Sequence, residues 1–247
     1  MPRVPWDAES ARKFTERLKQ QEGDPNRDIG SALRAEEIEK SAPPLQKKYL
    51  NETFFDTQLE TLLKKNIREE VVAFKWFQRH IGQLRKKVHD VSEVKNGRIP
   101  VLLVIPRKNM LLSKLLTFLE VEGSPGYTDL DVEKILDIVG FDRGSAPYLA
   151  YDVEVGVETL NLSPFECEQK FKAENRLGLL CDEGIALGIH FPNLIEKFSV
   201  NLIGTRYKAQ FVAAIKNSPI GPKLGFNFMD HRDELWGTPS CGGRISL

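Results

Sequence analysis

The sequence has no net charge and no long apolar run, and each absence excludes a class of protein. Its 247 residues contain 35 Lys and Arg against 35 Asp and Glu, so it lacks the positive charge that is typical of general nucleic-acid-binding proteins. The longest apolar run, Ile99 to Ile105, contains Pro100 and is much shorter than the roughly 20 residues of a membrane-spanning helix. We therefore expect a soluble protein that binds neither nucleic acid nor a membrane.

Cysteine is also scarce, and no cofactor motif is present. The three cysteines are Cys167, Cys181 and Cys241; their odd number and the charged start of the chain predict a reduced, cytoplasmic protein. The pairs Cys181/His190 and His231/Cys241 are spaced too widely for a structural zinc site. The chain has no Walker A sequence and no dinucleotide-binding glycine fingerprint. We therefore predict no metal and no cofactor.

Three parts can be distinguished along the chain. Residues 1–50 are polar and are interrupted by Gly and Pro, which predicts a partly disordered or loosely packed N-terminal arm. Within residues 51–96, apolar residues recur every three or four positions from Phe55 to Leu84, which predicts one long amphipathic helix that ends near Val88. Its polar face is basic, and we interpret this face as solvated rather than as a binding surface.

Residues 97–247 combine the patterns of strands and helices. Ile99–Ile105 reads as a buried strand and Tyr148–Val155 as an alternating one. Helices are expected over 108–120 and 130–139, after the cap Ser163-Pro164, and from Asp182. Three strand-length segments, 198–204, 210–215 and 223–228, have short connections, which favours an antiparallel meander. The prediction is an α+β domain with a mostly antiparallel sheet and flanking helices, preceded by the long helix.

The last twenty residues contain several groups that can carry chemistry. Cys241 could act as a nucleophile with His231 as its base, and the N–H groups of Gly242 and Gly243 could then bind the developing oxyanion. No recognised cysteine-hydrolase motif surrounds Cys241. We favour the interpretation that it is a packed structural thiol, because free cysteines are among the most buried residues.

Basic residues beside glycines indicate a second kind of site. Arg206, Lys223 and Arg244 each follow or adjoin a Gly-containing turn; if these strand ends converge, they form an anion pocket together with Gly242 and Gly243. The alternative is that Arg206 and Lys223 are turn residues and that Arg244 pairs with a nearby acid such as Asp230 or Asp233. The acidic pairs Asp152/Glu154 and Asp182/Glu183 are interpreted as a strand face and a helix start.

A series of short sequence motifs, which occur in a fixed order along the chain, resembles the pattern of a known family. In order, these motifs are Pro125-Gly126, Tyr148-Leu149, Asp152-Val153-Glu154, Asn161-Leu162-Ser163-Pro164, Glu183-Gly184-Ile185, Phe191-Pro192, Gly204-Thr205-Arg206, Pro222-Lys223-Leu224-Gly225, Trp236-Gly237 and Ser240-Cys241-Gly242-Gly243-Arg244. Over about residues 97–247 the chain resembles a family of uncharacterised, mainly bacterial proteins that is catalogued as a domain of unknown function. The resemblance implies an intracellular location and a single C-terminal unit, but no reaction.

Three functions remain as hypotheses. The first is a non-catalytic binding or interaction protein whose partner is a small anion or an anionic protein segment. The second is a small hydrolase or transferase that uses Cys241 and His231. The third is a scaffold or homodimer that associates through the long helix. Whether the protein is an enzyme is left open.

Overall fold

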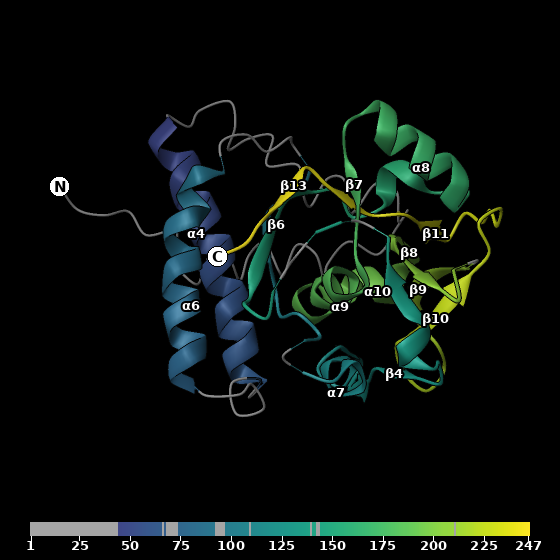
Figure 1. Ribbon diagram of the computed structural model, residues 1–247, viewed down its shortest axis with the longest axis horizontal. Helices are drawn as coiled ribbons and strands as arrows, with labels where there is room; N and C mark the ends of the chain where they lie inside the picture. Colours follow the sequence, from purple (N-terminus) through teal and green to yellow (C-terminus); the bar gives the residue numbers. More distant parts are fainter. Residues whose placement is uncertain are drawn as a thin grey trace.

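The computed structural model describes residues 44–65, 67, 74–91, 97–108, 110–138, 140–141, 144–209 and 211–247. Most of the predicted N-terminal arm, residues 1–43, lies outside these ranges. The described residues combine helices with antiparallel and mixed sheets (Figure 1), which confirms the predicted α+β class. No helix in the described ranges is long and apolar enough to cross a membrane.

The predicted long helix is wrong, because the chain folds there into two antiparallel helices, α4 (Pro44–Lys64) and α6 (Phe74–Lys87), which lie side by side in Figure 1. An ion pair joins Asp56 of α4 to Arg85 of α6, 29 residues further along the chain. In one continuous helix these two residues would be about 44 Å apart. A short 3-10 helix, η1 (Val88–Asp90), follows α6. The apolar period continues through both helices because both pack on the same core.

Several apolar residues of this helical region are covered by the protein's own chain. Phe55, Leu62, Ile67, Leu84 and Val88 are at most 1% exposed. The Gln58 side chain bonds to the neighbouring strand in both directions, donating to the Val101 carbonyl and accepting from the Leu103 N–H, each at 2.7 Å. These buried positions cannot serve as an interface with a second copy of the chain.

Two main sheets make up the rest of the fold. The first is antiparallel, in the order β1 (Ile99–Val104), β6 (Tyr148–Val153), β13 (Gly243–Ile245). The second contains the predicted meander of β8 (Ser199–Tyr207), β9 (Phe211–Lys216) and β10 (Lys223–Asn227), with β5 (Ile135–Asp137) pairing antiparallel to β8. Parallel strands extend it on both sides, β11 (Trp236–Gly237) beside β8 and β4 (Tyr127–Thr128) beside β10. Two small ladders pair β2 (Glu120–Val121) with β3 (Ser124–Pro125) and β7 (Leu177–Gly178) with β12 (Ser240–Cys241).

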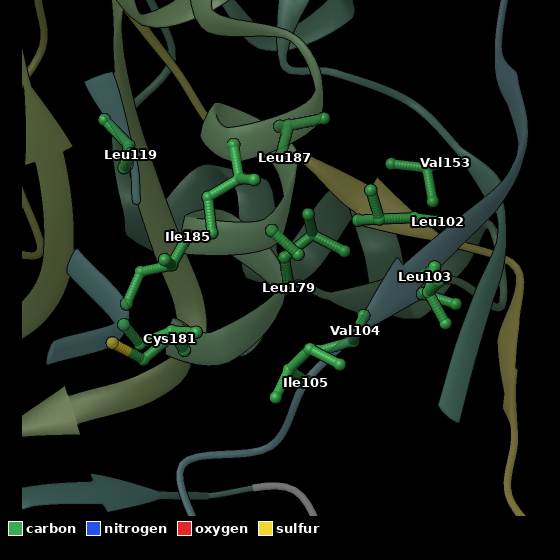
Figure 2. Close-up of a cluster of buried hydrophobic side chains, with 14 of the residues drawn as sticks. Leu102, Leu103, Val104, Ile105, Leu119, Val153, Leu179, Cys181, Ile185 and Leu187 are labelled. Atoms are coloured by element: carbon green, nitrogen blue, oxygen red, sulfur yellow. The ribbon is translucent and has the colours of Figure 1, made fainter. Parts of the chain in front are cut away.

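A buried helix, α9 (Cys181–His190), lies between the two sheets, and α10 (Pro192–Lys197) follows it. Figure 2 shows Ile185 and Leu187 of α9 in one apolar cluster with Leu102 of β1. A Cβ atom on Gly184 would collide with the Leu202 side chain of β8, so glycine is required for this close approach. The second sheet is covered on its other face by α8 (Pro164–Ala173), which contacts Ile203 and Val212.

Local sequence patterns predicted a helix start correctly. They predicted the wrong structure where a segment pairs with a strand that is distant in the sequence. Ser163 and Glu166 form the predicted capping box at the start of α8. The helix expected over 108–120 is reduced to α7 (Leu112–Leu116). The helix expected over 130–139 is instead the 3-10 turn η2 (Val132–Lys134) followed by β5, because pairing with β8 outweighs local propensity. A further 3-10 turn, η3 (Val157–Thr159), precedes α8.

Candidate functional site

The C-terminal segment from Ser240 to Arg244 is packed into the core. Cys241 is fully buried, and burial, followed by the charge of Glu183, raises the pKa of its thiol to about 12. The thiol is therefore protonated at neutral pH and is a poor nucleophile. His231 lies in the loop after β10, where its ring packs edge-on against Trp236 at 5.6 Å between centroids. The charged groups that act on Cys241 are Glu183, Arg244 and Arg176, so the structure does not pair Cys241 with His231.

Arg244 reaches back to the N-terminal turn of α9 and pairs with Glu183, not with Asp230 or Asp233. Its Nε lies 2.6 Å from Glu183 Oε1 and its Nη2 lies 2.9 Å from Oε2. The Tyr148 hydroxyl also donates to Oε1, at 3.1 Å. Burial alone would lower the pKa of Arg244, but the hydrogen bond and the charge of Glu183 outweigh it and raise the pKa. This buried pair joins the last strand to the central helix.

A second buried charge cluster lies at the other end of the same segment. Asp152 accepts from Arg98 Nη1 at 2.9 Å and from Arg176 Nη1 at 2.5 Å. Arg176 also donates to the Ser240 hydroxyl at 2.8 Å. Asp152 has a left-handed φ of 50°, which is costly for a residue with a side chain and is held here by its two Arg partners.

Glycines 242 and 243 make room for neighbouring side chains. A Cβ atom on Gly242 would lie 3.2 Å from the Cβ of Asp152, and one on Gly243 would collide with the Tyr151 hydroxyl. The space beside both glycines is therefore filled by Tyr151 and Asp152. We infer that these two positions are glycine because of packing.

Two titratable groups near the core have strongly shifted pKa values. Burial raises the pKa of Glu154 to about 7, although its carboxylate accepts hydrogen bonds from the Gly156 and Glu158 N–H groups. Burial lowers the pKa of His190 to about 4, while its Nε2 contacts the Leu103 carbonyl at 3.0 Å. His190 is thus a neutral, hydrogen-bonded histidine at a helix end, as its position before Phe191 suggests.

The three bases of the predicted anion pocket do not converge. Arg206 donates to the Ile203 carbonyl and pairs with Glu168 of α8. Lys223 pairs with Asp129 at 2.8 Å, which raises the pKa of Lys223 and lowers that of Asp129. Since Arg244 pairs with Glu183, each base has its own carboxylate on a different element. The predicted combination of Arg206, Lys223 and Arg244 in one pocket is wrong.

Lys223 nevertheless lines a different hollow, of about 200 Å³, which we call the Trp236 hollow. Its lining residues are Asp129, Leu130, Ala214, Lys216, Lys223, Gly225, Phe226 and Trp236. The strand register pairs Lys216 with Lys223 and Ala214 with Gly225, so these four residues lie on one face of the second sheet. This is the face that α8 covers at Val212, and the hollow lies further along it.

The chemistry of the Trp236 hollow suits a small anion. Two ammonium groups, from Lys216 and Lys223, outnumber the single carboxylate of Asp129. Ala214 and Gly225 form a floor without bulky side chains, and Trp236 supplies an aromatic wall. Behind the floor, Asn201 is the fully buried cross-strand partner of Ala214, and within the described part of the chain its Nδ2 has no hydrogen-bond partner. Lysine ammonium groups and an aromatic ring can together hold a flat, negatively charged group.

A second hollow is larger but chemically less suitable. It measures about 360 Å³ and is lined by turn residues of the β2–β3 and β9–β10 connections, with Glu122 as its only charged residue. Elsewhere among the described residues, no group of three or more His, Cys, Asp or Glu side chains could hold a metal ion. The Trp236 hollow is therefore the best candidate site.

Sequence patterns alone identified only part of this site. Lys223 and the Trp236-Gly237 motif were singled out, but Asp129, Ala214 and Lys216 were not. The alternation along β9 and β10 would have placed Lys216 and Ala214 on one face, had the register between the two strands been known.

Comparison with known proteins gives a family but no function. The chain matches no curated protein and no solved structure. One family model matches residues 62–246 and is described as a family of unknown function, DUF5701. The match begins within α4 and thus extends further toward the N-terminus than the resemblance noted from residue 97.

Proposed function

The chain belongs to this family of unknown function, and we propose that it is a non-catalytic binding protein that holds a small organic anion in the Trp236 hollow. The observation that carries the proposal is the direct cross-strand pairing of Lys216 with Lys223 beside the Trp236 hollow. Like charges at such positions destabilise a sheet, by about 0.2–1 kcal/mol. Asp129 forms an ion pair with Lys223 and also interacts with the charge of Lys216, so one carboxylate stands against two ammonium groups. A bound anion would balance the remaining positive charge.

The size of the hollow limits the ligand. At about 200 Å³ it is smaller than the roughly 300–1,000 Å³ of sites for drug-sized molecules. A carboxylate or phosphate attached to a single flat ring fits this volume, with the ring against the indole of Trp236. The free and buried state of the three cysteines supports a cytoplasmic location as part of the proposal.

The alternatives have less support. A hydrolase or transferase based on Cys241 and His231 requires a thiolate, which a pKa of about 12 disfavours at neutral pH. A homodimer through the helices requires an apolar face, whereas the core positions of α4 and α6 named above are buried. Anion binding in the Trp236 hollow requires neither a deprotonated Cys241 nor exposure of the buried residues of α4 and α6.

The proposal can be tested by calorimetric titration of the full chain with benzoate, indole-3-acetate and inorganic phosphate. We expect an aromatic carboxylate to bind and its affinity to fall at least tenfold in Lys216→Ala. Lys172→Ala is the matched control, because Lys172 is an exposed residue of α8 outside the hollow and its loss changes the net charge equally. Equal affinities in the two variants, or no binding of any of the three anions, would contradict the proposal.

A further inference from the structure

In the part of the chain that the structure describes, no strand pairs with the outer edge of β10 beyond Leu224, beside the Trp236 hollow. Strand β4 pairs with β10 only at Lys223 and Leu224, opposite Tyr127 and Thr128, whereas β9 pairs with β10 as far as Asn227. The chain leaves the edge at Asp129 and Leu130, which are both lining residues of the hollow. The hollow therefore adjoins a stretch of strand edge that β4 does not cover.

The backbone of Phe226 faces this free edge. The Thr128 hydroxyl donates to the Leu224 carbonyl at 2.9 Å, which shows that Leu224 directs its carbonyl toward β4. Backbone groups of every second residue point to the same side of a strand, so the N–H and C=O of Phe226 also point outward. Exposed edges of this kind are templates for pairing with another strand.

The two faces of the sheet at this edge differ in chemistry. One face carries Lys216 and Lys223 in the Trp236 hollow. On the other, the ring of Phe226, a residue that also borders the hollow, contacts Tyr207 and Phe211, with ring centroids 5.5 and 4.7 Å apart, and Phe211 contacts Phe228 at 5.3 Å. Phe226 and Phe228 remain 43% and 57% exposed, so part of this aromatic cluster can accept further apolar side chains.

We propose that the anion in the Trp236 hollow is the acidic side chain of an extended partner segment that adds to the free edge of β10. This inference rests on the proposed function and deepens it by naming the partner class, a peptide in which acidic and apolar residues alternate. Successive side chains of an added strand point to opposite faces, so the acidic ones meet the lysines while the apolar ones meet the aromatic cluster. Backbone hydrogen bonds to Phe226 supply the pairing.

The charges at this edge disfavour a second copy of the chain as the occupant. Because β4 already pairs with Lys223 and Leu224, a second copy could pair only with the stretch beyond Leu224, and it would bring a second Lys216 and Lys223 to the same contact. Like charges that approach one another destabilise such a contact. A partner with carboxylates in these positions has the complementary charge.

Fluorescence anisotropy with labelled, acetylated hexapeptides tests the inference. We expect a peptide of alternating glutamate and valine to bind the full chain at least tenfold more tightly than either of two control peptides. The first control has the same composition, with all glutamates in one block and all valines in the other. The second control alternates lysine and valine. The backbone nitrogens of the alternating peptide can be methylated at odd or at even positions. Methylation of the nitrogens that point toward β10 should abolish binding, whereas methylation of those that point away from β10 should not. Failure of the alternating peptide to bind, or equal binding of the blocked peptide, would overturn the inference.

Two substitutions at one position test the backbone contact from the protein side. Phe226→Pro removes the outward N–H, which proline can do on an edge strand without loss of the ladder to β9, and Phe226→Ala removes only the side chain. We expect peptide affinity to fall at least fivefold further in the proline variant than in the alanine variant. If both lose affinity equally, no backbone pairing occurs and the inference is overturned; if Phe226→Pro is unfolded by circular dichroism, the methylated peptides decide.

Titration with benzoate separates failure of the inference from failure of the proposed function. Benzoate binding that depends on Lys216, together with no preference for the alternating peptide, would overturn the peptide inference and leave the anion site intact. Loss of Lys216-dependent binding for both probes would overturn both. Dimerisation of the chain through β10, detected by light scattering and abolished in Phe226→Pro, would make a second copy the occupant and would also overturn the inference.

Discussion

Replacement of Arg244 by leucine should leave the carboxylate of Glu183 buried without its counter-charge. Glu183 is fully buried, and Arg244 contacts both of its carboxylate oxygens, at 2.6 and 2.9 Å. Removal of one partner from a buried ion pair costs about 3–5 kcal/mol, because the remaining charge stays in a poorly solvated site. The Tyr148 hydroxyl and the Leu180 N–H still donate to Glu183, so we expect a cost of about 3 kcal/mol, at the lower end of this range.

Urea unfolding followed by circular dichroism at pH 7 measures this loss. The double variant Arg244→Leu/Glu183→Leu is the control for the charge itself. It removes the uncompensated carboxylate but also the hydrogen bonds from Tyr148 and Leu180, at about 1 kcal/mol each. We expect it to be no less stable than the single variant. A single variant within about 1 kcal/mol of wild type would refute the assignment of Arg244 to a buried pair.

Three further predictions address burial and space. Because the folded-state pKa of Glu154 is raised to about 7 from 4.5, its contribution to stability is present below pH 4.5 and is lost as pH rises to about 7. Glu154→Gln should remove this decline and be about 3 kcal/mol more stable than wild type at pH 8 in urea unfolding. Parallel pH profiles of stability for the two proteins would contradict this prediction. Gly225→Ala should leave the melting temperature within about 2 °C of wild type, because an added Cβ meets no atom within 4 Å. It should nevertheless weaken benzoate binding, because the added methyl group reduces the volume of the Trp236 hollow. Gly243→Ala places a Cβ against the Tyr151 side chain and should lower the free energy of unfolding by about 1–3 kcal/mol. Finally, the three buried cysteines should react with a thiol reagent at pH 8 only after unfolding in urea, and rapid labelling of Cys241 in the folded protein would contradict its burial.

Local patterns in the sequence predicted those parts of the fold that depend on neighbouring residues. The apolar run from Ile99 forms β1, and the Ser163/Glu166 capping box begins α8 as expected. The short connections between 198 and 228 predicted the meander correctly, since such connections permit little else. The apolar period of residues 51–88 did not reveal the reversal between α4 and α6, because a helical hairpin packed on one core preserves that period across both helices.

Charge pairing and strand register depend on the whole fold and could not be predicted. Asp152 lies 54 residues from Arg98 and 24 from Arg176, and no local motif connects them. Glu183, which looked like a helix-capping residue, does accept from the Leu180 N–H but also binds Arg244. Lys216 and Lys223 face the same hollow only because of the β9–β10 register. The sequence therefore suggested an anion site that includes Lys223, but the other residues that line the Trp236 hollow could be identified only from the structure.

The most direct test of the account is the affinity of benzoate for wild type, Lys216→Ala and Lys172→Ala, measured by calorimetry at low ionic strength. The Trp236 hollow predicts saturable binding to wild type and Lys172→Ala, with at least a tenfold loss in Lys216→Ala. Identical binding curves for the two lysine variants, or no binding of benzoate, indole-3-acetate or phosphate to wild type, would contradict it.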